Sequence, residues 1–256
     1  VPIHDDRGRV IGFGARVLDP DDNPKYLNSP QTPLFDKSKV LFGLDAAKRS
    51  IRDTETAVIV EGYMDVIQAH QAGFTNVVAQ MGTAMTETQL GLIVPRYAKR
   101  VIMALDADDA GQNATRRSLE TARQTLAADY TGKLAVDIRV LQIPGAKDPD
   151  DLIREEPERW QSLVDNATPV AEYVINMETA SLSEGASLPE REQIARSVLP
   201  ILTASESDLY KQDNIQRLAM RLRIPERDLL RWASEQTAVN KQAAERRKQP
   251  PPPPRP

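Results

Sequence analysis

The sequence contains no cysteine, two histidines, and aromatic residues amounting to 5% of its 256 positions. Without thiols the chain can form neither disulfides nor a thiolate zinc site, and nothing in it points to an oxidising compartment. Catalysis by a Ser-His-Asp triad or by a cysteine has no support in such a composition. A Gly-rich phosphate loop of the GxxxxGK(S/T) type, or a GxGxxG motif after a strand, is also missing.

Long apolar runs are missing as well. No stretch approaches the roughly 20 residues that a membrane helix needs, and no signal peptide opens the chain, so we expect no membrane partner. The mean hydropathy of −0.46 is ordinary for a soluble protein, and the length allows one or two domains. The net charge of −4 argues against indiscriminate nucleic-acid binding but not against a basic patch on an acidic body.

Two short apolar runs end abruptly in acidic residues. Val58–Val60 leads into Glu61, and Val101–Leu105 leads into Asp106 and Asp108. Such runs predict strands that are buried on both faces of a parallel sheet. Because ligands bind outside the carboxyl ends of the strands in open α/β sheets, we expect these carboxylates to meet in one crevice.

Carboxylates gathered in one crevice repel one another unless a cation lies between them, and an all-oxygen set suits Mg²⁺ or Mn²⁺. Asp106 and Asp108 lie two positions apart, so in an extended segment both can reach one ion. Glu61 has no obvious cationic partner and is predicted to bind the metal or to act as general base. Such a site suits phosphoryl or nucleotidyl transfer, which needs aligned oxygens and neutralised negative charge.

Other acidic residues have competing interpretations. Asp65 follows the first strand closely and by itself predicts a helix cap. Asp148 and Asp150, with Asp151, could form a turn and the cap of the next helix. The metal interpretation is favoured because nearly every acid falls at or just past a strand exit. The predicted metal-binding set is Glu61, Asp65, Asp106, Asp108, Asp148 and Asp150.

Strand and helix patterns alternate over the middle of the chain, which predicts a small parallel sheet with right-handed crossovers. The predicted strands are Ala57–Val60, Asn76–Ala79, Val101–Leu105 and Leu134–Ile143, and the predicted helices begin near Leu44, Asp65, Thr86 and Gln112. Beyond Asp151 no further strand-type run is present. Apolar residues at helical spacing, such as Trp160, Val198 and Leu222, instead predict a helical bundle.

The first 39 residues are less regular. Val1–Leu18 holds two β-type runs around a turn and predicts a hairpin, and its glycines indicate close approach of another backbone. Residues 24–39 mix basic, aromatic and amide groups without periodicity, so they predict a loop that is either functional or simply solvated. The last residues, from about Val239, predict an extended proline-rich linker.

Several motifs together resemble known families. Glu61-Gly62 at a strand end, followed by Asp106 and Asp108 at another, resembles the toprim domain that bacterial primases share with type IA and II topoisomerases and some nucleases and recombination proteins. The longer strings Val60–Val66 (VEGYMDV) and Asp106–Gly111 (DADDAG) more specifically resemble bacterial replicative primases. Val10–Arg16, Pro24–Pro30 and Lys147–Asp150 extend the resemblance to bacterial replicative primases, in the family's order. The helical part resembles that family's polymerase core more loosely.

The resemblance implies a bacterial, cytoplasmic RNA polymerase core that makes short primers from ribonucleoside triphosphates on single-stranded DNA. Glu61 would be the catalytic acid or a metal ligand, and the other carboxylates would hold Mg²⁺ or Mn²⁺. The basic face that contacts nucleotide phosphates and template would comprise Arg16, Lys25, Tyr26, Asn28 and Lys37. The chain is expected to be a monomer whose helicase partner binds through a module beyond the proline run.

The expected fold is thus α/β: a small, mostly parallel toprim sheet flanked by helices, preceded by part of a mixed basic subdomain and followed by a helical bundle. The expected divisions are residues 1–54, 55–152, 153–238 and a linker at 239–256. The family's zinc-binding module would precede this sequence, so we expect weak or no priming from this stretch alone.

Two other functions stay open at this point. A toprim nuclease or topoisomerase-like enzyme is the first, although a topoisomerase would need a nucleophilic tyrosine on a separate domain. A non-catalytic toprim scaffold that clamps DNA is the second, but clustered carboxylates are costly to retain without a metal. Template-dependent ribonucleotide incorporation, against nicking of a supercoiled plasmid, distinguishes them.

Overall fold

The computed structural model describes residues 1–17, 19, 24, 26–81, 85–94, 96–104, 136–145, 148–180, 182–183, 185–203 and 208–235. The chain forms two compact units, Val1–Val170 and Ala171–Pro256. Within the described residues, no helix combines the length and the apolar character needed to cross a membrane. The predicted helix near Gln112 and the proline-rich linker lie outside the described residues.

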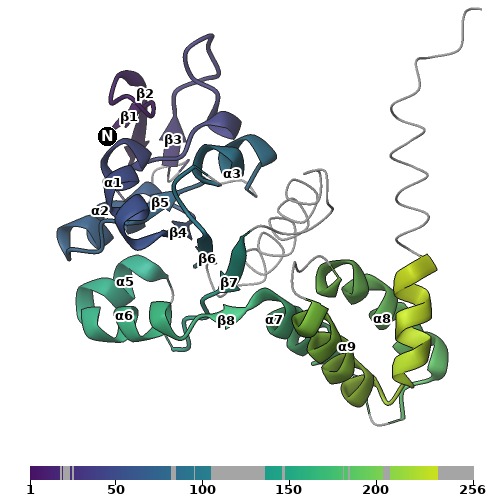
Figure 1. The fold of residues 1–256 in the computed structure, drawn as a ribbon. Helices are drawn as coiled ribbons and strands as arrows, with labels where there is room; N and C mark the ends of the chain where they lie inside the picture. The colour runs from purple at the N-terminus through teal and green to yellow at the C-terminus, as the bar shows by residue number, and fades with distance from the viewer. Residues whose placement is uncertain are drawn as a thin grey trace, which may run out of the picture. The chain divides into compact units, whose positions relative to one another are not determined.

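The first unit opens with an antiparallel sheet of strands β1 (Pro2–His4), β2 (Val10–Arg16) and β3 (Tyr26–Asn28), in that order (Figure 1). The predicted hairpin is confirmed. Asp5 closes its turn, because the side chain accepts hydrogen bonds from the backbone N–H groups of Arg7 and Arg9, both at 2.9 Å. The predicted loop is wrong at β3, which pairs with the end of β2 although its own residues show no alternation.

The second sheet of this unit has five strands in the order β5-β4-β6-β7-β8. The strands are β4 (Thr56–Val60), β5 (Val77–Ala79), β6 (Arg100–Met103), β7 (Asp137–Val140) and β8 (Thr168–Pro169). The first four are parallel to one another, as predicted. Strand β8 is antiparallel to β7 and contradicts the expectation of no strand after Asp151. Two residues, one of them proline, are too few to show a strand pattern.

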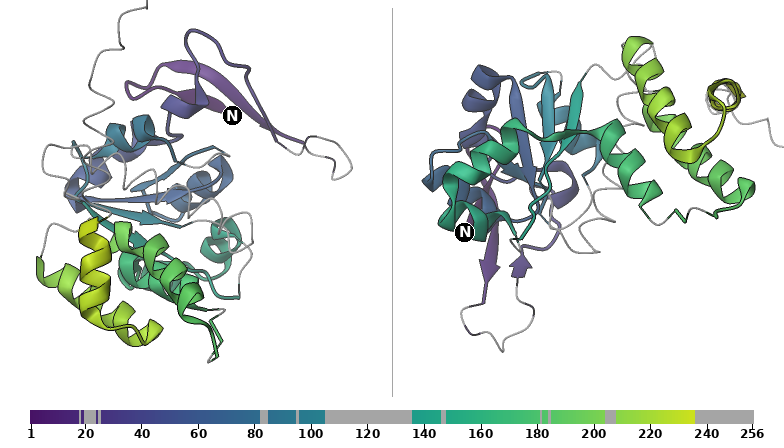
Figure 2. Two further views of the ribbon diagram at one scale, coloured as in Figure 1. Left: turned by 90° about the vertical axis from the view of Figure 1, so that its right-hand side faces the viewer. Right: turned by 90° about the horizontal axis from the view of Figure 1, so that it is seen from below.

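The strands form where the sequence is apolar without interruption. Ala57–Val60 is at most 1% exposed, as a central strand covered on both faces requires. The edge strand β5 is closed by Phe42, whose backbone N–H and C=O both bond to Ala79, at 2.9 and 3.1 Å. Figure 2 shows the purple N-terminal sheet and the larger sheet as separate sheets within this unit.

Five α-helices are described in the first unit: α1 (Leu44–Thr54), α2 (Tyr63–Gln71), α3 (Glu87–Ile93), α5 (Pro149–Glu155) and α6 (Pro157–Asp165). A short 3₁₀ helix, η1 (Lys37–Lys39), precedes them. Helix α5 packs against both α2 and α6. The segment between β4 and α2 therefore lies close to the segment that begins α5.

The second unit is helical in its described part, as predicted. Its helices are α7 (Val170–Thr179), α8 (Leu188–Leu202), α9 (Asp208–Leu222) and a last helix over residues 226–235. Val198, Leu218 and Leu222 are fully buried, which confirms the helical spacing of the core positions. A capping box begins α8, because the Ser187 N–H donates to the Glu190 carboxylate at 2.7 Å while Ser187 Oγ accepts from Glu190 N–H.

Candidate active site

The carboxyl ends of β4 and β5 are joined by backbone hydrogen bonds. The N–H of Gln80 donates to the Val60 carbonyl at 3.2 Å, and the N–H of Met81 donates to the Glu61 carbonyl at 3.0 Å. Met81 is buried with φ at 60°, in the left-handed region that side chains other than glycine rarely occupy. Strained backbone of this kind persists where the surroundings fix it, and it is enriched at functional sites.

Asp65 lies at the third position of α2, with Gly62 as the N-cap. The predicted helix is confirmed, but the prediction that Asp65 is its N-cap is wrong. The side chain still serves the helix start, because Oδ2 accepts from the Gly62 N–H at 3.0 Å. Its other oxygen, Oδ1, accepts from the backbone N–H of Asp150 at 3.1 Å. One buried carboxylate thus joins the loop after β4 to the start of α5.

The charge of Asp65 is unfavourable where it lies. The residue is 7% exposed, and burial, helped by Asp148 and Asp150, raises its pKa to about 6, although the N–H donors of Gly62 and Asp150 act in the opposite direction. No cationic side chain is among these influences. Divalent cations such as Mg²⁺ favour oxygen ligands of this kind.

The second acidic pair has two different surroundings. Asp148 is the N-cap of α5, and its Oδ1 accepts from the Asp151 N–H at 3.0 Å, so the helix-cap interpretation holds for this oxygen. Burial and Asp148 raise the pKa of Asp150, whereas Arg154 and Arg16 lower it. Arg16 belongs to β2 of the N-terminal sheet, so a charge on that sheet acts on a carboxylate at the start of α5.

Tyr26 of β3 lies at the same edge. Burial raises the pKa of its hydroxyl, Arg16 lowers it, and the carboxylates of Asp65, Asp148 and Asp150 raise it further. The Arg16 guanidinium carbon lies 5.8 Å from the centre of the Tyr26 ring, within the range of a cation–π contact. An aromatic ring and a guanidinium therefore lie within electrostatic reach of these carboxylates, a combination that suits a base and a phosphate.

Tyr63, in the first turn of α2, connects this pair to the acidic loops. Its ring meets that of Tyr26 edge-on at 5.6 Å and that of Phe42 at 5.8 Å. Its hydroxyl donates to the Ala15 carbonyl at 2.7 Å, one residue before Arg16. The helix that presents Asp65 therefore also holds the end of β2.

The glycines of β2 are explained by aromatic rings, not by another backbone as predicted. A Cβ on Gly14 would lie 3.1 Å from the Tyr63 ring, and one on Gly12 would lie 3.1 Å from the Phe35 ring. The side-chain oxygen of Asn28 is buried nearby without a hydrogen-bond partner in the described part of the chain. Such an acceptor is satisfied when a ligand or water donates to it.

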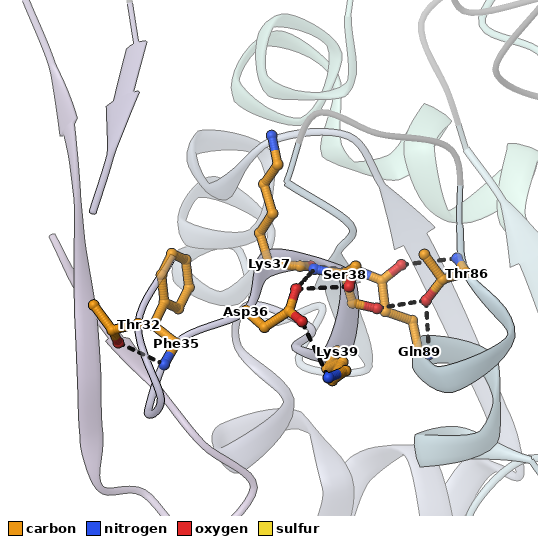
Figure 3. A network of polar contacts seen from close by, with 8 residues as sticks. All are labelled: Thr32, Phe35, Asp36, Lys37, Ser38, Lys39, Thr86 and Gln89. Atoms are coloured by element: carbon orange, nitrogen blue, oxygen red, sulfur yellow. Dashed lines mark hydrogen bonds and ion pairs between the residues drawn. The ribbon is translucent and has the colours of Figure 1, made fainter. Parts of the chain in front are cut away.

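Lys37 is exposed at the start of η1, and its backbone is held by a polar network (Figure 3). Asp36 caps this turn by accepting from the Ser38 N–H at 3.0 Å and the Ser38 hydroxyl at 2.6 Å. The carbonyl of Lys37 accepts from the side-chain amide of Gln89 at 3.0 Å. Figure 3 shows the Lys37 side chain extending away from these partners.

Three predicted residues, Asp106, Asp108 and Lys25, lie outside the described residues. Where the chain is described, no group of three or more His, Asp or Glu side chains could hold a metal ion. The metal-binding set therefore stays a prediction, with Asp65 and Asp150 joined by a hydrogen bond. Sequence reasoning missed Tyr63 and Gln89, although Tyr63 lies within the VEGYMDV motif and Gln89 within the predicted capping box.

Comparison with known families agrees with this geometry. Residues 58–153 match the family described as Toprim-like, and residues 1–48 match the N-terminal domain of the DNA primase catalytic core. The match over residues 58–153, together with the parallel strands β5-β4-β6-β7, defines a toprim-domain protein.

Relatives narrow the class further. The DNA primase of Clostridium acetobutylicum is 42% identical over 213 residues, which cover 82% of this chain and 34% of that protein. A solved DNA primase domain from Pseudomonas aeruginosa is 34% identical with a TM-score of 0.75, covering 91% of this chain and 70% of that one. A DnaG primase catalytic domain solved with single-stranded DNA is 33% identical with the same TM-score of 0.75, covering 89% of this chain and 69% of that one.

The chain belongs to the DnaG-type DNA primase family and matches its catalytic core, with the toprim domain included. Toprim domains typically depend on divalent metal. The chain spans about a third of the length of the curated relatives that it matches.

Proposed function

We propose that this chain is the part of a DNA primase that joins ribonucleotides into short primers on single-stranded DNA, with Mg²⁺ or Mn²⁺. The observation that carries the proposal is the position of Asp65. This buried carboxylate joins the loop after β4 to the start of α5, and Tyr63 of the same helix contacts Tyr26, over which Arg16 lies. The contacts of Asp65, Tyr63, Tyr26 and Arg16 support a site in which acidic groups for metal and basic, aromatic groups for nucleotides are close together.

The residues present fit a divalent metal by their chemistry. We propose that Glu61, Asp65, Asp106, Asp108, Asp148 and Asp150 provide its ligand set, with Glu61 as the catalytic acid or as a ligand. When bound, the metal would neutralise phosphate charge and align the reacting oxygens. Asp65 also fixes the Gly62 and Asp150 backbone, so its loss would displace both loops.

Arg16, Lys25, Tyr26, Asn28 and Lys37 are proposed to contact nucleotide phosphates and template. Two observations support this face: the Arg16–Tyr26 stacking distance of 5.8 Å and the exposed Lys37 side chain. The solved relative that contains single-stranded DNA supports the same ligand class. Cations neutralise phosphate, and a tyrosine ring stacks on any base, so the face would bind template without reading its sequence.

The divisions at 1–54, 55–152, 153–238 and 239–256 are kept as a proposal, and the extents of the two family matches, 1–48 and 58–153, support the first two. The helicase partner, the monomeric state and the location in the bacterial cytoplasm stay predictions.

The proposal is tested by template-dependent incorporation of ribonucleotides with Mn²⁺, run beside nicking of a supercoiled plasmid. We expect weak incorporation and no nicking. Asp108→Ala should abolish the incorporation, and Asp213→Ala, which removes an exposed carboxylate on α9, is the matched control. Nicking without incorporation, or an Asp108→Ala variant as active as the parent, would refute the proposal.

A further inference from the structure

The turn that carries Lys37 is held by two polar side chains from α3. Gln89 is completely buried, and its amide group donates to the carbonyls of Lys37 at 3.0 Å and Val40 at 2.9 Å. Thr86 donates its hydroxyl to the carbonyl of Ser38 at 2.5 Å. Three carbonyls of one short turn are therefore taken by two side chains about 50 residues further along the chain, and Figure 3 shows Thr86 and Gln89 beside Lys37 and Ser38.

Gln89 is itself fixed from the other side. Its Oε1 accepts from the Thr86 N–H at 3.0 Å, and Thr86 Oγ1 accepts from the Gln89 N–H at 3.1 Å. The amide nitrogen also lies 3.4 Å from the Gln80 carbonyl. An amide has two N–H groups, so three carbonyls share them and the side chain has no other orientation that satisfies them all. Buried side chains held by several bonds in this way favour one conformation, while the side-chain oxygen of the neighbouring Gln80 is buried without a hydrogen-bond partner among the described residues.

The same network reaches the strand exits. Gln80 donates its N–H to Val60, and the next residue, Met81, donates to Glu61. A continuous path of hydrogen bonds therefore runs from the backbone of Lys37, through one side-chain amide, to the backbone of Glu61. Each step lies within the unit Val1–Val170.

We propose that Gln89, with Thr86, is a positioning residue for Lys37. By fixing the backbone of the turn, these two side chains set the distance between the lysine and the acidic strand exit. This inference rests on the proposed contact between Lys37 and nucleic acid. A helix-capping glutamine needs only its own helix start as a partner. Gln89 uses one oxygen for that purpose and gives its nitrogen to the lysine turn and the neighbouring strand exit.

The test measures the affinity of the 256-residue chain for a fluorescein-labelled single-stranded DNA oligonucleotide over a series of salt concentrations. Lys37→Ala should weaken binding and reduce the salt slope by about 0.7, the value for one phosphate contact on a single strand. Gln89→Leu, which has a similar volume, should weaken binding roughly two- to tenfold and reduce the slope in the same direction. When Gln89→Leu is added to the Lys37→Ala variant, it should weaken binding by less than about a further twofold, because its effect depends on the lysine side chain.

Asn76→Leu is the matched control. Asn76 also donates its side-chain amide to a backbone carbonyl, that of Thr56 at 3.1 Å, but it precedes β5 and lies at the opposite end of that strand from Gln80. It should lower the stability of the fold and leave affinity and salt slope unchanged. Thr86→Val removes the bond to Ser38 and provides a milder second variant, with an expected effect in the same direction as Gln89→Leu.

The outcomes separate this inference from the proposed function. If Lys37→Ala binds like the parent, the assignment of Lys37 fails and the positioning role fails with it. If Lys37→Ala binds weakly while Gln89→Leu and Thr86→Val keep the parental salt slope, only the positioning role is overturned. Additive losses in the double variant would also overturn it, because a residue that acts through Lys37 has no effect once the amine is gone.

Discussion

The two units bury different kinds of side chain. Among the described residues, the first unit buries the polar side chains of Asp65, Gln80 and Gln89, and all three lie at or beside the carboxyl ends of strands. In the described part of the second unit, the buried polar side chain is Thr179, whose hydroxyl donates to the Ile175 carbonyl of its own helix at 2.7 Å and accepts from the Arg221 side chain of α9 at 3.2 Å.

Buried polar groups cost free energy unless every bond is made, so their position is informative. In the first unit the buried carboxylate and amide connect segments that are distant in the sequence, Gly62 with Asp150 and Lys37 with Gln80. In the described part of the second unit, the buried hydroxyl of Thr179 also makes a long-range bond, with Arg221. The units therefore differ in the kind of polar group that they bury: the first buries a carboxylate and two amides beside the proposed site, and the described part of the second buries a hydroxyl within a helical core.

The largest expected effect tests whether the second unit is only a scaffold. Leu218→Ala empties a fully buried position on α9 and should destabilise that unit by about 2–5 kcal/mol. Hydrogen exchange should rise in peptides from α8 and α9 and stay unchanged in β4 and β5. Affinity for single-stranded DNA should remain within about twofold of the parent. A loss of affinity larger than that would place the second unit in the binding site and break the comparison.

The next effect concerns the charge of Asp65. Its pKa is raised from 3.8 to about 6, so the folded chain keeps a proton that the unfolded chain loses. The stability contributed by that proton is fully present below about pH 4 and is lost as pH rises through about 6. A shift of this size corresponds to an upper limit of about 3 kcal/mol.

Asp65→Asn should remove this dependence, because the amide does not titrate. Urea unfolding in EDTA between pH 4 and pH 8 should give a flatter stability profile than that of the parent, while Mn²⁺-dependent incorporation should fall below detection. Asn76→Leu is the control, since it replaces a neutral side chain and should lower stability equally at every pH. A variant as pH-dependent as the parent would show that Asp65 carries no unfavourable charge.

Local patterns were sufficient for the parts of the fold that are locally determined. Val58–Val60 and Val101–Met103 are apolar without interruption and form strands as predicted, and Glu61 directly follows the first of them. Strand β3 was missed because Tyr26 and Leu27 are both exposed and the strand exists only through its pairing with β2.

The candidate site, too, could be predicted from the sequence only where it depends on local patterns. The acidic motif pointed to metal chemistry, but the Tyr63–Ala15 and Gln89–Lys37 bonds join residues 48 and 52 positions apart. No periodicity or spacing rule contains such a pairing, since it is created when the N-terminal segment packs against the larger sheet. Sequence reasoning therefore supplied the candidate ligands and missed the side chains that position them.

The smallest expected effect sharpens the comparison with one identical change in each unit. Tyr63→Phe removes the hydroxyl that donates to the Ala15 carbonyl and keeps the ring contacts with Tyr26 and Phe42. Loss of this bond should cost about 1 kcal/mol of stability. Because Ala15 precedes Arg16, template affinity should also fall roughly two- to fivefold, the size of one weakened cation–π or phosphate contact.

Tyr173→Phe makes the same change at a buried position of α7 in the second unit, and it should leave the affinity unaltered. Stability and fluorescence-anisotropy titrations on both variants measure the two effects side by side. If the two tyrosine variants bound single-stranded DNA equally well, Tyr63 would be an ordinary core tyrosine. The first unit's polar contacts would then stabilise the fold in the same way as the helical packing of the second, without placing Arg16 for a ligand.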